Sequence, residues 1–98
     1  NFDVFIPNAF SPNFDGVNDY LEVYAGTSVK QIKSFKVFNR WGALVFYSEA
    51  FEPLSGIGRW DGIFNGLACN SELFTYVTEV IFINGDTRIF EGGVLLVR

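Results

Sequence analysis

The sequence contains no histidine, and it has only one cysteine, Cys69, and three prolines in 98 residues. Without histidine the chain cannot build a Ser-His-Asp triad, a cysteine nucleophile with an imidazole base, or the usual zinc sites. A single cysteine excludes an internal disulfide. No run of roughly 18 apolar residues occurs, so we expect no transmembrane segment. These absences remove the commonest routes to catalysis and to membrane insertion.

Charge is also scarce, and it is mostly negative. The chain has 7 Lys and Arg against 11 Asp and Glu, for a net charge of −4. Nucleic-acid binding rests on neutralised phosphates, so this balance argues against a nucleic-acid partner. Paired carboxylates for glycoside chemistry remain formally possible. A compact chain of 98 residues leaves little room for a cleft between them, so we expect no enzymatic activity.

Aromatic and apolar residues are abundant instead. Apolar residues make up 49% of the chain, with 12 Phe, 4 Tyr and 2 Trp. This composition is typical of one globular domain with a packed core. The chain starts abruptly on a β-like run and shows no signal peptide, so we expect residues 1–98 to be a single domain excised from a longer protein.

Alternating and β-branched runs predict an all-β fold. Predicted strands cover residues 2–6, 20–24, 28–40, 43–47, 73–83 and 87–97. The 28–40 segment is ambiguous, because Val29, Ile32, Phe35 and Phe38 have a helical spacing. Its β-branched and aromatic content favours a strand with a bulge. With the aromatic crossover described next, the pattern predicts an immunoglobulin-like antiparallel β-sandwich of about seven strands.

Turn signals separate these runs. Trp60 precedes Asp61-Gly62 and then Asn65-Gly66. We expect Trp60 to be a buried anchor before a short crossover, and regard a sugar-stacking role as the lesser alternative. Trp41-Gly42 predicts a hairpin, and Asn84-Gly85 predicts a type I′ hairpin turn. Gly92-Gly93 indicates a bulge or a site of close approach.

Several linked motifs resemble one family. Five segments, in this order along the chain, are similar to the gliding motility-associated C-terminal domain. They are Phe5 to Asp19, Phe38 to Gly42, Trp60 to Gly62, Phe74 to Glu79 and the terminal Gly93 to Arg98. The chain departs from the family pattern in two places. Phe14 stands where the family usually has Gly, and Cys69-Asn70-Ser71-Glu72 replaces a more usual turn with small residues.

The resemblance implies a function in protein export. Such domains are type B sorting domains at the C-terminus of large exported proteins of Bacteroidetes-type bacteria. They direct a passenger protein through the type IX secretion system to the cell surface or the extracellular space. The implied partners are outer-membrane or translocon components of that system.

The loop from Ser11 to Glu22 is the candidate metal site. Overlaid on a twelve-residue calcium loop, Asn13, Asp15, Asp19 and Glu22 occupy positions three, five, nine and twelve. Position one is Ser11 and no helix flanks the loop, which are faults in the match. The alternative is that these residues only cap turns. We expect no required cofactor, with Ca²⁺ as the candidate ligand.

Two segments are candidates for partner binding. The first contains Arg40 and Trp41, with Lys36 nearby on the same strand. Trp and Arg are enriched in binding hot spots. The favoured alternative is a purely structural role. It places Trp41 against the edge of the core, with Arg40 stacked on an aromatic ring or paired with a carboxylate. The second segment is the end of the chain: Gly93, Val94, Leu95, Leu96, Val97 and Arg98.

Two other functions remain open at this level. One is an adhesive or carbohydrate-binding surface module, which requires exposed aromatic rings. The other is a purely structural cap. Whether Trp41 and Trp60 are buried distinguishes the adhesive or carbohydrate-binding function from the sorting function.

Overall fold

The computed structural model describes residues 4–12, 19–52 and 58–97, and this part of the chain is all-β. The strands are β1 (Val4–Phe5), β2 (Ala9–Phe10), β3 (Tyr24–Ala25), β4 (Val29–Phe38), β5 (Leu44–Phe51), β6 (Ile63–Phe64), β7 (Leu67–Ala68), β8 (Glu72–Phe82) and β9 (Thr87–Leu96).

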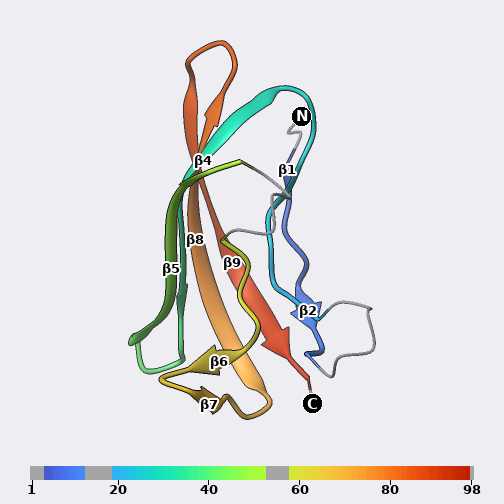
Figure 1. Cartoon of the computed structure of the whole chain (residues 1–98), viewed down its shortest axis with the longest axis vertical. Coiled ribbons are helices and arrows are strands. Elements are labelled where there is room, and N and C mark those ends of the chain that lie inside the picture. The colour runs from blue at the N-terminus through green and yellow to red at the C-terminus, as the bar shows by residue number, and fades with distance from the viewer. Residues whose placement is uncertain (1–3, 13–18, 53–57, 98) are drawn as a thin grey trace.

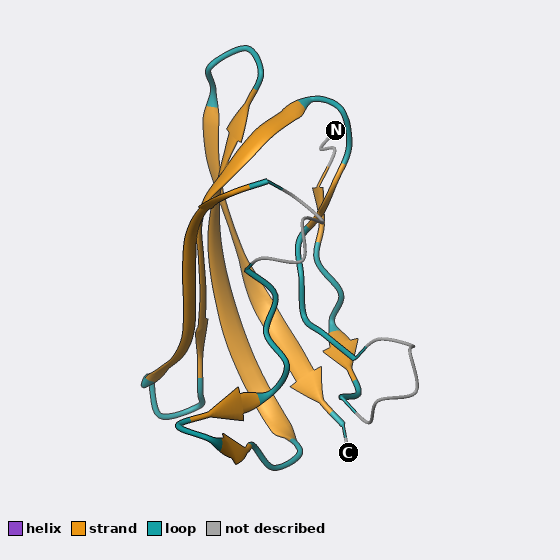
Figure 2. Cartoon of the chain, viewed as in Figure 1, coloured by secondary structure: helices purple, strands orange, loops and turns teal. Residues whose placement is uncertain are grey.

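The main layer is a five-stranded sheet in the order β2-β9-β8-β4-β5, in which β9, β8, β4 and β5 are the long ribbons of Figures 1 and 2 and β2 is a short arrow. The opposing layer contains the β1–β3 pair and an isolated bridge between Leu21 and Trp60, and β6 and β7 form a small separate hairpin. The β-sandwich prediction is confirmed. The described residues form nine strands rather than about seven, and one pair, β2–β9, is parallel rather than antiparallel.

Strand β4 resolves the ambiguity of residues 28–40. Its pairing with β8 shifts register between Val29 and Gln31 and again between Ile32 and Ser34. Each bulge inserts one residue and moves the next inward side chain from position i+2 to i+3. Val29, Ile32 and Phe35 therefore all face the core at a spacing that imitates a helix. The predicted bulged strand is confirmed.

Two predicted boundaries were wrong. Strand β5 continues past Tyr47 to Phe51, because Phe51 pairs with Ile32 and is buried. The predicted strand at 20–24 is reduced to β3, which starts at Tyr24. Leu21 is held instead by two backbone bonds to Trp60, of 2.8 and 2.9 Å.

The two Asn-Gly pairs make different turns. Asn65 and Gly66 both have positive φ, 55° and 79°, and join β6 to β7 as a two-residue type I′ turn. At Asn84-Gly85 the type I′ prediction was wrong, since only Gly85 has a positive φ, of 93°. The amide of Gly85 donates to the carbonyl of Phe82, which makes a three-residue loop. The Asn84 side chain accepts the amide of Asp86 and holds this longer loop closed.

The glycine pair in β9 is not a bulge, because the β8–β9 register runs unbroken from Glu72 to Thr87. Gly92 is instead a site of close approach. A Cβ there would lie 2.8 Å from the Tyr76 hydroxyl oxygen, on the ring that packs over it. Burial raises the pKa of Tyr76.

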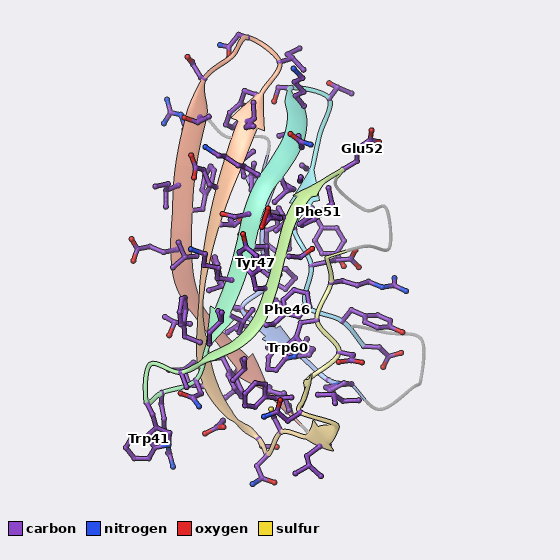
Figure 3. All side chains as sticks on the ribbon, turned by 60° about the vertical axis from the view of Figure 1, so that its left-hand side comes forward. Trp41, Phe46, Tyr47, Phe51, Glu52 and Trp60 are labelled. Carbon is purple, nitrogen blue, oxygen red and sulfur yellow. The ribbon has the colours of Figure 1, made fainter. Side chains whose placement is uncertain are left out.

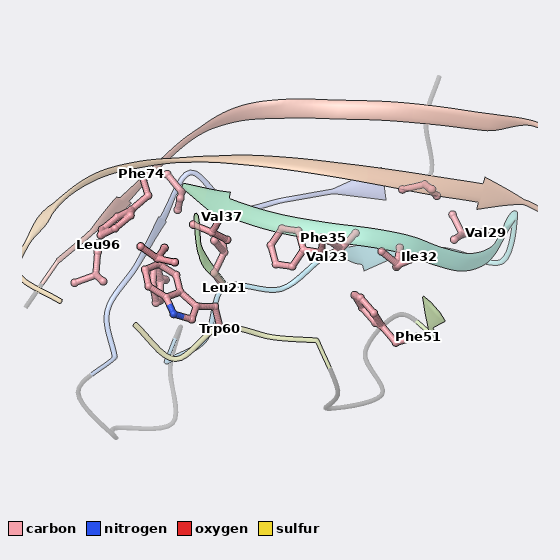
Figure 4. Packing of buried hydrophobic residues seen from close by; sticks show 14 residues of the cluster. Leu21, Val23, Val29, Ile32, Phe35, Val37, Phe51, Trp60, Phe74 and Leu96 are labelled. Atoms are coloured by element: carbon pink, nitrogen blue, oxygen red, sulfur yellow. The ribbon is translucent and has the colours of Figure 1, made fainter. Parts of the chain in front are cut away.

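Trp60 is the centre of the core, as expected. It is 1% exposed, and its ring lies 5.6 Å from Phe10 and 4.9 Å from Phe74 between centroids. Figure 4 shows it beside Phe74, Leu96 and Leu21, which come from both layers. The indole N–H donates to the carbonyl of Ile63 at 3.0 Å, so its polar atom is satisfied.

Replacing Trp60 tests whether this ring holds the layers together. Trp60→Ala should lower the free energy of unfolding by about 3–5 kcal/mol, because it removes a buried aromatic and leaves a cavity. Urea denaturation followed by circular dichroism measures the change. Trp41→Ala is the matched control and should change stability by less than about 0.5 kcal/mol, since that ring is exposed. Equal losses in both variants would contradict this assignment.

Candidate functional site

The turn between β4 and β5 is built by the side chain of Asn39. Its Oδ1 accepts the amides of Trp41 at 2.9 Å and Ala43 at 3.0 Å. The Asn39 backbone closes the loop through its bonds to Gly42 and Ala43. Gly42 has a φ of 83°, which an L side chain adopts only with strain. The turn is therefore fixed by four hydrogen bonds within five residues.

Trp41 lies at the tip of this turn and is 78% exposed. Figure 3 shows its ring at one end of the molecule, directed away from the core. The expectation that Trp41 packs on the edge of the core was wrong. The reason is the five-residue loop from Asn39 to Ala43, which carries the side chain beyond the last paired residue, Phe38, opposite Leu44.

Arg40 holds the indole from one side. Its guanidinium carbon lies 5.0 Å from the Trp41 ring centroid, and its Nε lies 3.6 Å from a carboxylate oxygen of Glu72. Both predicted interactions of Arg40 are therefore present. The ion pair is solvent-exposed and weak by itself, but it anchors the cation over the ring. The result is a large apolar side chain displayed in a restricted orientation.

Further along the outer face of the sheet, Lys36 pairs across the strands with Tyr47, and its ammonium lies 5.8 Å from that ring. The Tyr47 hydroxyl donates to Glu49, and this hydrogen bond raises the pKa of Tyr47. Lys36 is on the strand, whereas Arg40 is in the turn, so the expected shared strand face does not extend to Arg40.

The C-terminal segment is split by the alternation of β9. The side chains of Val94 and Leu96 are fully buried in the core and are not available to a partner. Leu95 and Val97 are exposed, as is Gly93, while Arg98 lies outside the described residues. The backbone of Leu95 and Val97 is already bonded to Asn8 and Phe10. This segment therefore supports the fold as well as offering surface.

The calcium loop is only partly described. Asp19 and Glu22 are half-buried, and Asn13 and Asp15 lie outside the described residues. Within residues 4–12, 19–52 and 58–97, no group of three or more potential metal ligands occurs. The calcium site therefore stays a prediction.

One contact was missed by the sequence reasoning. The Arg59 guanidinium carbon lies 3.8 Å from the ring centroid of Tyr20. The two residues flank Trp60 and Leu21, whose backbone bridge brings the segments together. No spacing in the sequence signals this pair, because it depends on the contact between two loops.

The fold and this surface define a class of protein: a β-sandwich domain that displays an ordered aromatic turn at one end. A family model of the CHU_C type IX secretion signal domain matches residues 4–96, so the chain belongs to that family. The resemblance seen in the motifs is confirmed, and it assigns the domain to type IX secretion. A search of curated proteins found no match. No helix in the described residues is long and apolar enough to cross a membrane.

A calcium titration tests the predicted metal loop. If Asp15 and Asp19 bind Ca²⁺, calcium at about 100 times its Kd should raise the melting temperature by roughly 10 °C or more over the chelated protein. Thermal melts with calcium and with chelator measure this. Asp15→Ala should abolish the shift, and Asp61→Ala is the control, since Asp61 caps its own turn by accepting the amide of Ile63. Identical melts with and without calcium would leave only turn capping.

Proposed function

We propose that this domain is the C-terminal sorting domain of a longer exported protein. It directs its passenger through the type IX secretion system to the bacterial cell surface. In this mechanism a component of the secretion system at the outer membrane binds the folded domain, and the passenger follows. The family match supports the export role.

The observation that carries the docking surface is the exposed Trp41 held by Arg40. Exposure of 78% is exceptional for a side chain of this size in a domain whose other tryptophan is 1% exposed. Ordering a surface before binding removes part of the entropy cost of association. Trp and Arg also dominate measured hot spots. We therefore assign Trp41 and Arg40 as the central contact with the secretion component.

The surrounding surface fits such a contact. Leu44 and Leu73 are large exposed apolar residues, and they lie at the ends of β5 and β8 next to the turn. Glu72 precedes Leu73 and pairs with Arg40. An apolar centre with a polar border is the usual anatomy of a protein–protein interface.

We propose that the domain acts by binding alone, without catalysis. The absence of histidine and the displayed aromatic turn support this. The carbohydrate-binding alternative rests on the same exposed ring of Trp41, because Trp60 is buried. Arg40 already lies over Trp41, which favours a protein contact over a stacked sugar.

An export assay tests the proposal. The domain is fused to a reporter in a bacterium that has a type IX secretion system, and surface-exposed reporter is quantified. Trp41→Ala should lower surface reporter by about tenfold or more, as expected for loss of a hot-spot side chain. Arg40→Lys should give a smaller loss, since it keeps the charge but loses the planar stacking.

Leu67→Ala is the matched control. Leu67 is 73% exposed on the β6–β7 hairpin at the same end of the molecule, so its export should match wild type. Purified variants are compared by thermal melting to separate export from folding. A wild-type fusion that stays inside the cell would refute the sorting role. Normal export of Trp41→Ala would refute only the docking surface.

A further inference from the structure

Strand β9 has one side that is only partly used. It is ten residues long, and β2 pairs with only its last two, through Ala9 opposite Leu95 and Phe10 opposite Leu96. The amide of Leu95 donates to the carbonyl of Asn8 at 2.8 Å, and that of Val97 to Phe10 at 2.9 Å. Strand β2 thus marks a strand position beside β9 that it occupies for a short distance.

Among the described residues, no backbone partner is found for the groups along the rest of this position. The β8–β9 register is continuous, so residues at alternate positions from Leu95 backward direct their N–H and C=O to the β2 side. These residues are Gly93, Glu91 and Ile89. Of the described residues, none bonds to the backbone of these three on that side. Such a row of donors and acceptors is a template for another strand.

Strand β2 begins at Ala9, and the chain before it turns away from β9. Pro7 lies one position before Asn8, whose carbonyl faces β9, so the missing N–H of Pro7 faces away from β9 and suits an edge strand. From Pro7 the chain crosses back to Phe5 in β1, which pairs with β3 in the other layer. Within the described part of the chain, this crossing leaves the β9 edge from Ile89 to Gly93 uncovered.

A hollow opens at this crossing. It has a volume of about 450 Å³ and is lined by Phe5, Pro7, Asn8, Ala9 and Tyr24. Phe5 is 63% exposed, and its ring centroid lies 6.1 Å from that of Tyr24. The lining is more apolar than polar: Phe5, Pro7 and Ala9 are apolar, and Asn8 and Tyr24 have side chains with polar groups. It fits a bulky apolar side chain better than a sugar, whose many hydroxyl groups would lack partners.

We propose that the vacant edge of β9 accepts an extended segment of another polypeptide, which adds a strand beside Ile89, Glu91 and Gly93 and places one bulky apolar side chain in the Phe5–Tyr24 hollow. Main-chain hydrogen bonds supply affinity in this mode, and the hollow supplies specificity. The uncovered edge from Ile89 to Gly93 accommodates a strand of about five residues at 3.3 Å per residue.

Charge argues against a second copy of this chain as the occupant in the register centred on Glu91. Two copies joined at this edge and centred on Glu91 would bring two carboxylates together, and each domain carries a net charge of −4. Like charges opposite one another destabilise a strand pair. The segment that fits therefore carries a Lys or Arg opposite Glu91.

This site shares no residue with the Trp41 turn. The proposal therefore stands whether or not that turn is the docking surface for export.

The test uses purified domain and a phage-displayed library of random ten-residue peptides. The most enriched peptide is synthesised, and amide hydrogen exchange is measured by NMR. The expected peptide is extended, with a bulky apolar residue and a basic residue at fixed positions. The amides of Ile89, Glu91 and Gly93 should exchange at least about tenfold more slowly in the complex.

Variants separate the two parts of the site. Glu91→Pro removes a donor on the vacant side and keeps the pairing with β8, and it should raise the peptide Kd about tenfold or more. Glu91→Gln keeps the donor and should lose only the preference for a basic residue. Phe5→Ala should raise the Kd by a similar factor, and Trp41→Ala should leave it unchanged.

Four results would overturn the proposal: no enriched peptide, protection confined to other strands, wild-type affinity in both Glu91→Pro and Phe5→Ala, or a concentration-dependent dimer through this edge in sedimentation. If Glu91→Pro does not fold, Ile89→Pro takes its place, and the exchange pattern of the wild-type complex decides.

Discussion

The packing of Trp60 between Phe10 and Phe74 is the interaction on which the rest of the structure depends. The two layers are unequal: the main sheet has long ladders, whereas the opposing layer has a two-residue pair and a single bridge. Backbone hydrogen bonds therefore cannot hold the second layer in place by themselves. Trp60 holds it in place in two ways. Its backbone is hydrogen-bonded to Leu21, and its ring packs against Phe10 of β2 and Phe74 of β8. Hydrophobic burial at this one residue joins segments that share few hydrogen bonds.

This asymmetry leaves surface for recognition. In the part of the chain that the structure describes, one face of the five-stranded sheet is covered by the opposing layer, and the turn that carries Trp41 extends past the end of the sheet. The turn is rigid because Asn39 supplies the capping bonds within it. At the opposite edge β9 is covered by β2 over a short distance only. A sorting domain of this form can offer a displayed side chain at one place and an extended backbone edge at another, both attached to one core.

Part of the fold could be predicted from local patterns, and particular residues show where this fails. The strand predicted at residues 73–83 is observed as β8, Glu72–Phe82, because an unbulged strand keeps a period of two that can be recognised in the sequence. In β4 the two bulges broke that period, and the spacing alone did not distinguish it from a helix. Asn65-Gly66 and Asn84-Gly85 are the same dipeptide in different turns. Ile83 donates its amide to Ser28, a tertiary contact that sets the longer loop and has no local signal.

The candidate site shows the same division. The sequence by itself determined the family, the all-β class, the lack of histidine chemistry and the places where the chain reverses, because these follow from residue identity and short-range conformational preference. The tertiary structure alone decided that one tryptophan is buried and the other displayed. It also decided that Val94 and Leu96 face inward while Leu95 faces outward. Burial depends on what lies opposite a side chain in space, and residues distant in the sequence supply that environment.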